Sequence, residues 1–418
     1  MQTLMTPKWL GAALVFSAVM GVGGRARAAA PLIVAEVAPT TGRFALHAES
    51  DRRGVEMAID AFNAEGGVLG RHIVLVSRNP TLDPAHAATV AEDLITREHV
   101  GFMVGAIDSG VAAAMSAVCQ RHGVIFINTN SSAPSESVEN AHRTKFVFDA
   151  SAANYNRALF AYALKRPGVA KKVVLLTEDD AFGHSAAQAS RDIIEEDGGS
   201  VVGEVVVPAA LPDPRDAIRR VEASGADVVA VNITGANQIR LFSQIDPAAL
   251  RRQAWLVGEV DWEELYPAPG TPRPLYAINW SWNLDTPGTA AFVAAYRARW
   301  GHTGIDYPGK VTYSAYFATR ALLDAVRDAG TTDNHAVIRR LEQLHWSAAR
   351  RMQADGAWMD PVSHHLQQTI YVATWKPRAD HPEQGQVVLA HFSPEEVRYP
   401  RESRTHLESF AQTPHFAP

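Results

Sequence analysis

Hydroxyl and backbone donors that could bind a small anion follow two apolar runs in the first third of the chain. Ser109 comes just after the apolar run 101–105, at the beginning of a predicted helix whose free N–H groups can hold a carboxylate. The hydroxyl-rich stretch 129–134, Thr-Asn-Ser-Ser-Ala-Pro, follows the next apolar run in the same way. Because open α/β sheets bind ligands beyond the carboxyl ends of their strands, we predict a site for a small molecule here.

Comparable polar loops recur in the second half of the chain. They lie at 178–183, 234–237 and 258–262, each after a predicted strand. Helix capping or turn chemistry explains any one such loop. Their joint occurrence in both halves, together with the loop 39–45 after the first predicted strand, favours a cleft that two lobes share.

No catalytic or cofactor motif accompanies these loops. The chain lacks Gly-x-Ser-x-Gly, Gly-x-Gly-x-x-Gly and the phosphate-binding Gly-x-x-x-x-Gly-Lys-Ser/Thr motif, which argues against hydrolase, dinucleotide and nucleotide sites. Adjacent His364 and His365 on an extended segment would point to opposite faces, so we predict a solvated pair and no metal site. The acidic pair Asp179-Asp180 and the run 195–197 are predicted to be helix-terminus or surface charge. We therefore expect a binding protein that is not an enzyme and uses no cofactor or metal.

The elements that must position these residues follow a regular rhythm. Short apolar runs alternate with amphipathic stretches of helical length, which is typical of a parallel sheet with helices on both faces. In the first half, the predicted strands are 32–37, 73–77, 101–105 and 124–128, and the predicted helices are 51–65, 85–98 and 111–122. After Ala150 the predicted strands are 172–177, 200–207, 227–232 and 255–257, and the helices are 154–165, 185–196, 213–224 and 238–244. We predict an α/β fold with two doubly wound parallel-sheet lobes.

The last third of the chain shows a different pattern. Four prolines between positions 267 and 274 predict a loop, and 275–282 is expected to cross between the lobes. Further helices are predicted at 289–300, 313–329 and 334–344. Residues 379–418 are rich in Pro, His and charge and lack periodicity, so we expect a surface-clinging or disordered tail.

Residues 1–28 have the layout of an export signal. A cation at Lys8 precedes the apolar stretch 9–22, and Ala26-Arg-Ala28 forms a small-x-small cleavage site. The apolar stretch is shorter than the ~20 residues that a membrane-spanning helix needs. We predict cleavage after Ala28 and a freely diffusing periplasmic protein.

The net charge bears on the partners of the protein, and the cysteine content bears on its disulfides. The formal net charge of −6 argues against a nucleic-acid partner. Cys119 is the only cysteine, so no intramolecular disulfide can form, and its apolar surroundings predict a buried, inert thiol.

Several motifs together resemble one known family. The most specific is the stretch 62–71, Phe-Asn-Ala-Glu-Gly-Gly-Val-Leu-Gly-Arg. It is accompanied by Gly42-Arg-Phe-Ala45, Arg53-Gly-Val-Glu-Met-Ala58, Asp83-Pro84, Phe102-Met-Val-Gly105 and Glu178-Asp-Asp-Ala-Phe-Gly183. From about residue 32 to about residue 376 the chain resembles the leucine/isoleucine/valine-binding type of ABC-transporter substrate-binding protein.

This resemblance implies a type I periplasmic binding fold, with three hinge crossovers and ligand closure between lobes. The expected lobe boundaries are 29–149 with 278–345, and 150–277 with 346–378. The implied role is the periplasmic solute-binding component of an ABC importer, a monomer that delivers its ligand to a permease in the inner membrane. A sensory protein that reports a solute to a membrane signalling partner stays an alternative.

The resemblance also implies ligand contacts. Ser109 matches the serine that binds a ligand α-carboxylate, and Asn130 and Ser132 match the next loop, which contacts carboxylate and amine. Glu259 matches the acid that pairs with the α-ammonium in amino-acid binders, and His47 matches a side chain of the specificity pocket.

The sequence departs from the amino-acid binders of this family at two places, so the identity of the ligand stays open. Phe182 stands where amino-acid binders commonly place Tyr, and an aromatic residue common in those binders is absent near Thr234. We expect a small carboxylated solute, with a branched-chain or other amino acid, an amide or urea, and an aromatic acid as candidates. Trp262, Trp280 and Trp282 would leave room for a flat solute.

Overall fold

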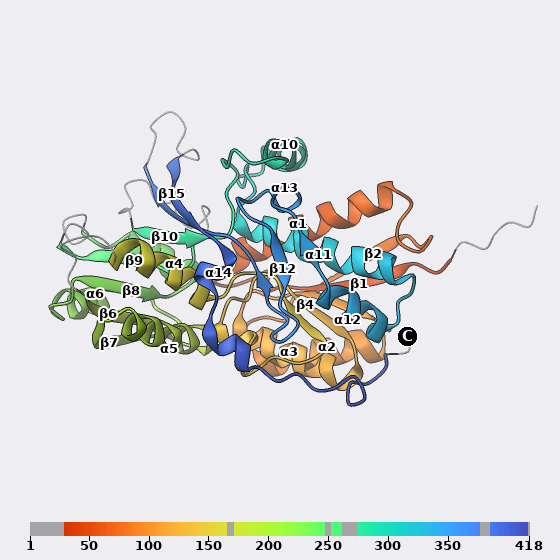
Figure 1. The fold of residues 1–418 in the computed structure, drawn as a ribbon, viewed down its shortest axis with the longest axis horizontal. Coiled ribbons are helices and arrows are strands. Elements are labelled where there is room, and N and C mark those ends of the chain that lie inside the picture. Colours follow the sequence, from red (N-terminus) through yellow and green to blue (C-terminus); the bar gives the residue numbers. More distant parts are fainter. Residues whose placement is uncertain (1–28, 165–170, 247–251, 261–273, 377–384, 417–418) are drawn as a thin grey trace, which may run out of the picture.

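The computed structural model describes residues 29–164, 171–246, 252–260, 274–376 and 385–416. Two α/β lobes lie side by side in Figure 1, one built on a five-stranded sheet and one on a seven-stranded sheet. This architecture confirms the predicted fold class. The proposed export signal, Trp262 and most of the proline-rich loop lie outside the described residues.

The first lobe contains an all-parallel sheet in the order β2-β1-β3-β4-β5. Its strands are β1 (Leu32–Val37), β2 (Ile73–Arg78), β3 (Phe102–Gly105), β4 (Ile125–Asn128) and β5 (Lys145–Val147). Alternate residues of β1 pack on opposite faces: Val34 joins the core beneath α1 (Ala45–Ala64), and Ala35 joins the core beneath α2 (Pro84–Thr96) and α3 (Ser109–His122). Buried strands of this kind read as continuous apolar runs, which is why the sequence revealed them.

A second long helix, α11 (Lys310–Ala329), packs along α1. Gly54 permits the close approach, because a Cβ at this position would lie 2.2 Å from the carbonyl oxygen of Thr312. The first lobe also carries α10 (Thr289–Trp300), α12 (Asn334–Glu342) and the short η1 (Pro134–Glu136). The helix pair α1 and α11 therefore fixes residues from distant parts of the chain on one side of the first sheet.

The second lobe contains a mixed sheet in the order β15-β14-β10-β9-β8-β6-β7. Its parallel strands are β6 (Lys172–Asp179), β7 (Ser200–Pro208), β8 (Val228–Asn232), β9 (Ala254–Val257) and β10 (Leu275–Ile278). The strands β14 (Ile370–Trp375) and β15 (Gln386–Phe392) extend the sheet in antiparallel pairing. The helices α4 (Ala152–Leu164) and α5 (Ala181–Glu196) cover one face, and α6 (Arg215–Glu222) and α7 (Gly235–Phe242) cover the other.

The chain crosses between the two lobes after β5, after β10 and after β13 (Leu366–Gln367). The small sheet of β11 (His345–Trp346), β12 (Ala357–Met359) and β13, with α13 (Ala348–Arg351), lies beside β5 of the first lobe. We therefore place the third crossing at 367–370, later than the predicted boundary after residue 345. Side chains connect the crossings: Asn279 Nδ2 lies 3.1 Å from Asp149 Oδ1, and Gln368 Nε2 donates to the carbonyl oxygen of Phe148.

The predicted solvation of His364 and His365 is wrong. Both rings are buried, and each contacts a carboxylate that is distant in sequence. His364 Nε2 lies 3.0 Å from Glu342, and its ring stacks on Phe146. His365 Nδ1 lies 2.7 Å from Glu402, which raises the pKa of His365 against the effect of its burial.

The C-terminal residues 379–418 were expected to form a surface-clinging or disordered tail. For residues 385–416 the structure shows defined elements instead. These residues form β15, α14 (Pro394–Val397) and η3 (Pro400–Arg404), and then run beneath the first lobe in Figure 1. The segment contacts both lobes: Arg401 pairs with Asp192 of α5, and Pro414 accepts a hydrogen bond from Asn334 of α12. Apolar residues of the segment also pack on the cores, among them Val397 and Tyr399.

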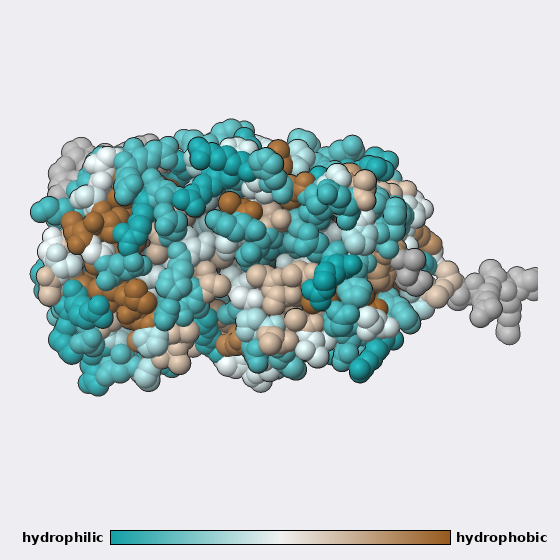
Figure 2. Space-filling view, turned by 90° about the horizontal axis from the view of Figure 1, so that it is seen from below, coloured by the Kyte–Doolittle hydropathy of each residue, from teal (hydrophilic) through white to brown (hydrophobic). Residues whose placement is uncertain are grey.

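Cys119 is buried, as predicted, and burial raises the pKa of its thiol. The face of the molecule in Figure 2 is largely hydrophilic, with apolar residues in separate patches. Among the residues that the structure covers, no helix combines the length and apolar character needed to cross a membrane.

Candidate functional site

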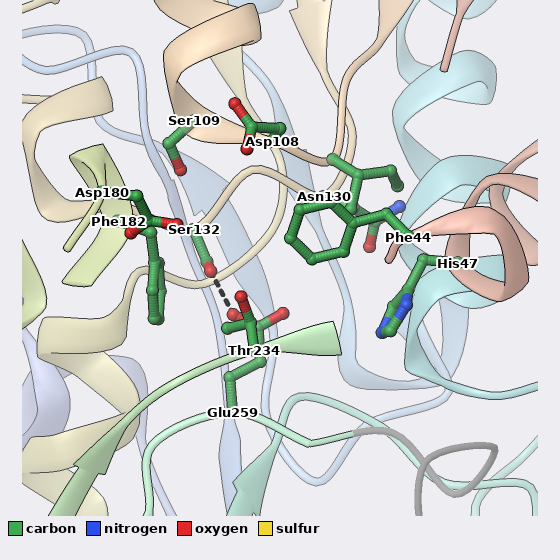
Figure 3. A pocket seen from close by; sticks show the side chains of 11 residues that line it. Phe44, His47, Asp108, Ser109, Asn130, Ser132, Asp180, Phe182, Thr234 and Glu259 are labelled. Atoms are coloured by element: carbon green, nitrogen blue, oxygen red, sulfur yellow. Dashed lines mark hydrogen bonds between the residues drawn. The ribbon is translucent and has the colours of Figure 1, made fainter. Parts of the chain in front are cut away.

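A cavity lies between the two lobes, and Figure 3 shows the side chains that line it. All seven residues singled out from the sequence line this cavity: His47, Ser109, Asn130, Ser132, Phe182, Thr234 and Glu259. Four further residues complete the lining: Phe44, Ile107, Asp108 and Asp180. The residues that the sequence analysis singled out by strand ends and by the family resemblance therefore meet at one cavity.

On the first lobe, the beginning of α3 faces the cavity. Asp108 is the N-cap of this helix, and its side chain accepts a hydrogen bond from the backbone N–H of Val111 at 3.0 Å. Ser109 is the first helical residue and is buried, with its Oγ 3.0 Å from Ser131 Oγ. A hydroxyl beside the positive end of a helix suits an anionic group of a ligand.

The neighbouring loop is held by its own side chains. Asn128 accepts from the N–H of Ser131 and donates to the carbonyl oxygen of the same residue, which fixes the turn after β4. Asn130 donates to Asp51 at 2.6 Å and to the carbonyl oxygen of Val311 at 3.1 Å. The Asn130 amide nitrogen is thus committed to α1 and α11. Burial raises the pKa of Asp51 to about 7, against the effect of this hydrogen bond.

The second lobe contributes three strand ends. Asp180, after β6, caps α5 by accepting from the N–H of Gly183 at 2.8 Å, and Phe182 follows in the first turn. Thr234 stands at the N-cap of α7. Glu259 follows β9, and its carbonyl oxygen accepts from Gln238 Nε2 at 2.9 Å, which fixes the backbone of this loop.

Sequence reasoning missed Lys310. Its ammonium group is buried and forms an ion pair with Glu259, and it lies 3.2 Å from Asp149 Oδ2. The hydroxyl of Ser132 donates to the other oxygen of Glu259. Burial raises the pKa of Glu259, and Lys310 opposes that shift. No local pattern could have revealed this contact, because Lys310 and Glu259 are 51 positions apart in the sequence.

Sequence reasoning also gave Arg43 no role of its own. Its guanidinium lies 3.3 Å from Asp108 of the first lobe and 2.6 Å from Asp180 of the second, and it pairs with the buried carboxylate of Glu178. Burial raises the pKa of Glu178 to about 7, and Arg43 opposes this rise. Asn237 donates to Glu178 as well. Arg43 is therefore an ionic connection between the lobes at the edge of the cavity.

The lobes are closed in this structure. The space open to the centre of a water molecule inside the cavity is about 20 Å³, so a ligand larger than a few atoms requires the lobes or side chains to move. Two of the tryptophans expected to leave room for a flat solute do not line the cavity. Trp280 stacks on Tyr313 in the core, and Trp282 packs against Tyr307 and Trp375. The aromatic walls are instead Phe44 and Phe182.

Two α/β lobes that direct strand ends and helix N-termini into one enclosed cavity define a two-lobed ligand-binding protein. The chain belongs to the periplasmic binding protein family, whose model matches residues 32–382. This family implies a periplasmic location. Within the described residues, no group of three or more His, Cys, Asp and Glu side chains is arranged to hold a metal ion.

Individual relatives agree with the family. Leu/Ile/Val-binding protein homolog 7 of Brucella abortus (strain 2308) is 26% identical over 371 residues, which cover 84% of this chain and 91% of the relative. The resemblance to the leucine/isoleucine/valine-binding type is confirmed. The matched relatives are named as binding proteins.

Solved structures share the fold. A solute-binding protein of an ABC transporter from Rhodopseudomonas palustris BisB5, in complex with 3,4-dihydroxybenzoic acid, superposes with a TM-score of 0.76 at 20% identity and covers 87% of this chain and 98% of its own. A branched-chain amino acid ABC transporter periplasmic ligand-binding protein from Burkholderia xenovorans LB400 also has a TM-score of 0.76 at 20% identity, with coverage of 90% and 99%. At this level of identity the likeness establishes the fold.

Proposed function

We propose that this protein is the periplasmic solute-binding component of an ABC importer and that it binds a small carboxylated solute between its lobes. The observation that carries the proposal is Ser109, a buried hydroxyl at the N-terminus of α3 that opens into the cavity. Backbone N–H groups and a hydroxyl at a helix N-terminus bind a carboxylate. Structural neighbours include proteins solved with benzoate and with 4-hydroxybenzoate, which are carboxylates as well.

Binding acts through closure of the lobes. Arg43 contacts Asp180, and Ser132 and Lys310 contact Glu259, so each pair joins one lobe to the other. A ligand that touches both walls adds to these contacts in the closed form only, and it shifts the population from open to closed. The closed form then docks on a permease in the inner membrane.

The remaining parts of the proposal follow from this role. Residues 1–28 direct export and are cleaved after Ala28, and the mature protein is a monomer. It is not an enzyme and uses no cofactor, in keeping with its relatives, which are named as binding proteins. His47 and Phe182 shape the cavity around the part of the solute that does not carry the carboxylate.

A thermal-shift screen of the protein without residues 1–28 tests the proposal. The screen compares carboxylic acids with their carboxamides, because the amide keeps the shape and loses the charge. A ligand at 100 times its dissociation constant adds about 2.7 kcal/mol to stability, so a true ligand raises the melting temperature measurably. Shifts for acids and not for their amides support the proposal, and shifts for amides alone contradict it. Loss of uptake of the best ligand on deletion of the gene tests the importer role.

A further inference from the structure

Three carboxylates line the cavity among the residues that the structure describes, and each is paired with a cation of the chain itself. Asp108 and Asp180 lie 3.3 Å and 2.6 Å from the guanidinium of Arg43, and Glu259 pairs with Lys310. A ligand ammonium needs a carboxylate to offset its loss of water when the lobes close. Among the described residues of the cavity lining, each acid is therefore already bound to a positive charge.

The position of Lys310 is unusual for a lysine. It is the first residue of α11 and is 1% exposed, so its charge lies at the positive end of a long helix and away from water. Asp149 and Glu259 offset these two costs. Asp149 is itself held in place, because its Oδ1 accepts from the N–H of Ala150, from the hydroxyl of Tyr155 and from Asn279 Nδ2. Lys310 is therefore a fixed part of the site.

Glu259 has a donor on each of its two oxygens. Lys310 holds one oxygen, and the hydroxyl of Ser132 holds the other. A ligand ammonium that approached Glu259 would come close to the Lys310 ammonium and meet a like charge in a site shielded from water. A ligand without an amino group meets no such repulsion.

We propose that Lys310 supplies, from within the chain, the positive charge that Glu259 would otherwise take from a ligand, so that the cavity selects carboxylates without an amino group over α-amino acids. This inference rests on the proposed function, and it names the class of carboxylate. The rings of Phe44 and Phe182 on the cavity wall suit an apolar remainder of such an acid.

Calorimetry with pairs of ligands that differ only in the amino group tests the inference on the protein without residues 1–28. The pairs are 3-phenylpropanoate and phenylalanine, phenylacetate and phenylglycine, and 4-methylpentanoate and leucine. The tightest acid of the thermal-shift screen is added with its 2-amino derivative. We expect each bound acid to be at least tenfold tighter than its amino derivative. An amino acid that binds as tightly as its deaminated partner overturns the inference and leaves carboxylate binding intact.

Substitution of Lys310 tests the cause of this selectivity. In Lys310→Met, Glu259 loses its cation. We expect the affinity of each acid, divided by the affinity of its amino derivative, to be at least tenfold lower in this variant than in the wild type. Lys310→Gln is the second variant, because it keeps a hydrogen-bond donor if the apolar variant does not fold. The matched control is Lys145→Met, which breaks another buried ion pair, to Glu136 at 2.5 Å, outside the cavity lining.

The outcomes separate the two proposals. An unchanged ratio in both Lys310 variants overturns the role of Lys310, even if the wild-type protein prefers acids. An equal change in Lys145→Met overturns it too, because the effect would then come from general loosening of the fold. If no carboxylate binds in the screen or in the pairs, the proposed function fails first and this inference fails with it.

Discussion

The guanidinium of Arg43 lies 2.6 Å from the carboxylate of Asp180, and this contact joins the first lobe to the second. The same guanidinium contacts Asp108 at 3.3 Å and pairs with Glu178. Arg43 thus completes an ionic network in which the contacts to Asp180 and Glu178 cross from one lobe to the other. Its strength sets part of the balance between the open and closed forms.

Removal of Arg43 should open the protein. In Arg43→Met three carboxylates lose their cation, and breaking a partly buried pair in this way costs about 2–5 kcal/mol. Because that cost falls on the closed form, ligand affinity should drop about tenfold or more, and small-angle X-ray scattering should give a larger radius of gyration without ligand. Arg215→Met is the control, since Arg215 pairs on the surface with nearby Asp213. Equal affinity in Arg43→Met and in the wild type would contradict a closing role.

Loss of either cavity serine should weaken binding. Hydrogen bonds to a charged group contribute about 1.5–3 kcal/mol each. Ser109→Ala removes a donor to the ligand carboxylate, and Ser132→Ala removes the donor to Glu259 that joins the lobes, so each should reduce affinity about tenfold or more in calorimetry. Ser116→Ala is the matched control, because Ser116 is a buried serine of the same helix α3 whose hydroxyl donates to the carbonyl oxygen of Ala113. Unchanged affinity in both cavity variants would mean that other groups hold the ligand.

The pH dependence of stability should carry the signature of Glu36. Burial, together with the nearby carboxyl of Asp51, raises the pKa of this strand β1 carboxyl from 4.5 to about 8. Between these two pH values the folded protein binds more protons than the unfolded chain, so stability falls as the pH rises. Glu36→Gln removes this effect. The free energy of unfolding of the variant minus that of the wild type should therefore increase by up to about 1.4 kcal/mol for each pH unit in this range.

Urea unfolding of the Glu36→Gln variant and the wild type at pH 5, 6, 7 and 8 measures this difference. Glu65→Gln, an exposed substitution at the end of α1, serves as the control and should show no such trend. A constant difference between Glu36→Gln and the wild type across this range would show that Glu36 titrates normally.

The ordered C-terminal segment should contribute to stability through Glu402. This buried carboxylate accepts from His365 at 2.7 Å, from Ser137 at 3.1 Å and from Gln367 at 3.1 Å. Because removal of one partner of a buried pair costs about 3–5 kcal/mol, Glu402→Gln should lower the melting temperature by several degrees. The exposed Glu395→Gln should not, and a similar melting temperature for both variants would argue against a structural role of the segment.

The sequence predicted the parts of the site that have a local signal. Ser109, Ser132 and Glu259 each follow a buried strand, and the carboxyl ends of parallel strands meet at one edge of a sheet, so their convergence followed from the chain rhythm. The fold class followed in the same way. Helix α1 begins at Ala45, before the predicted start at 51. The sequence could not show this start, because no side chain caps the helix there.

The parts of the site that the sequence did not predict depend on contacts between residues that are far apart in the chain. Arg43 and Glu178 lie far apart in sequence, as do Lys310 and Glu259, and charge pairing across lobes leaves no periodic pattern. His365 looked solvated because its partner Glu402 belongs to a segment that was expected to be a tail. Long-range ion pairs are set by the assembled fold, and a single sequence does not display them.

The position of the ligand can be measured in a crystal structure of the protein with the tightest carboxylate from the screen. We predict a ligand enclosed between the lobes, with its carboxylate within hydrogen-bond distance of Ser109 and its apolar part between Phe44 and Phe182. We also predict that the Lys310 ion pair with Glu259 stays intact. A ligand bound outside this cavity, or one that turns its carboxylate away from the N-terminus of α3, would contradict the account.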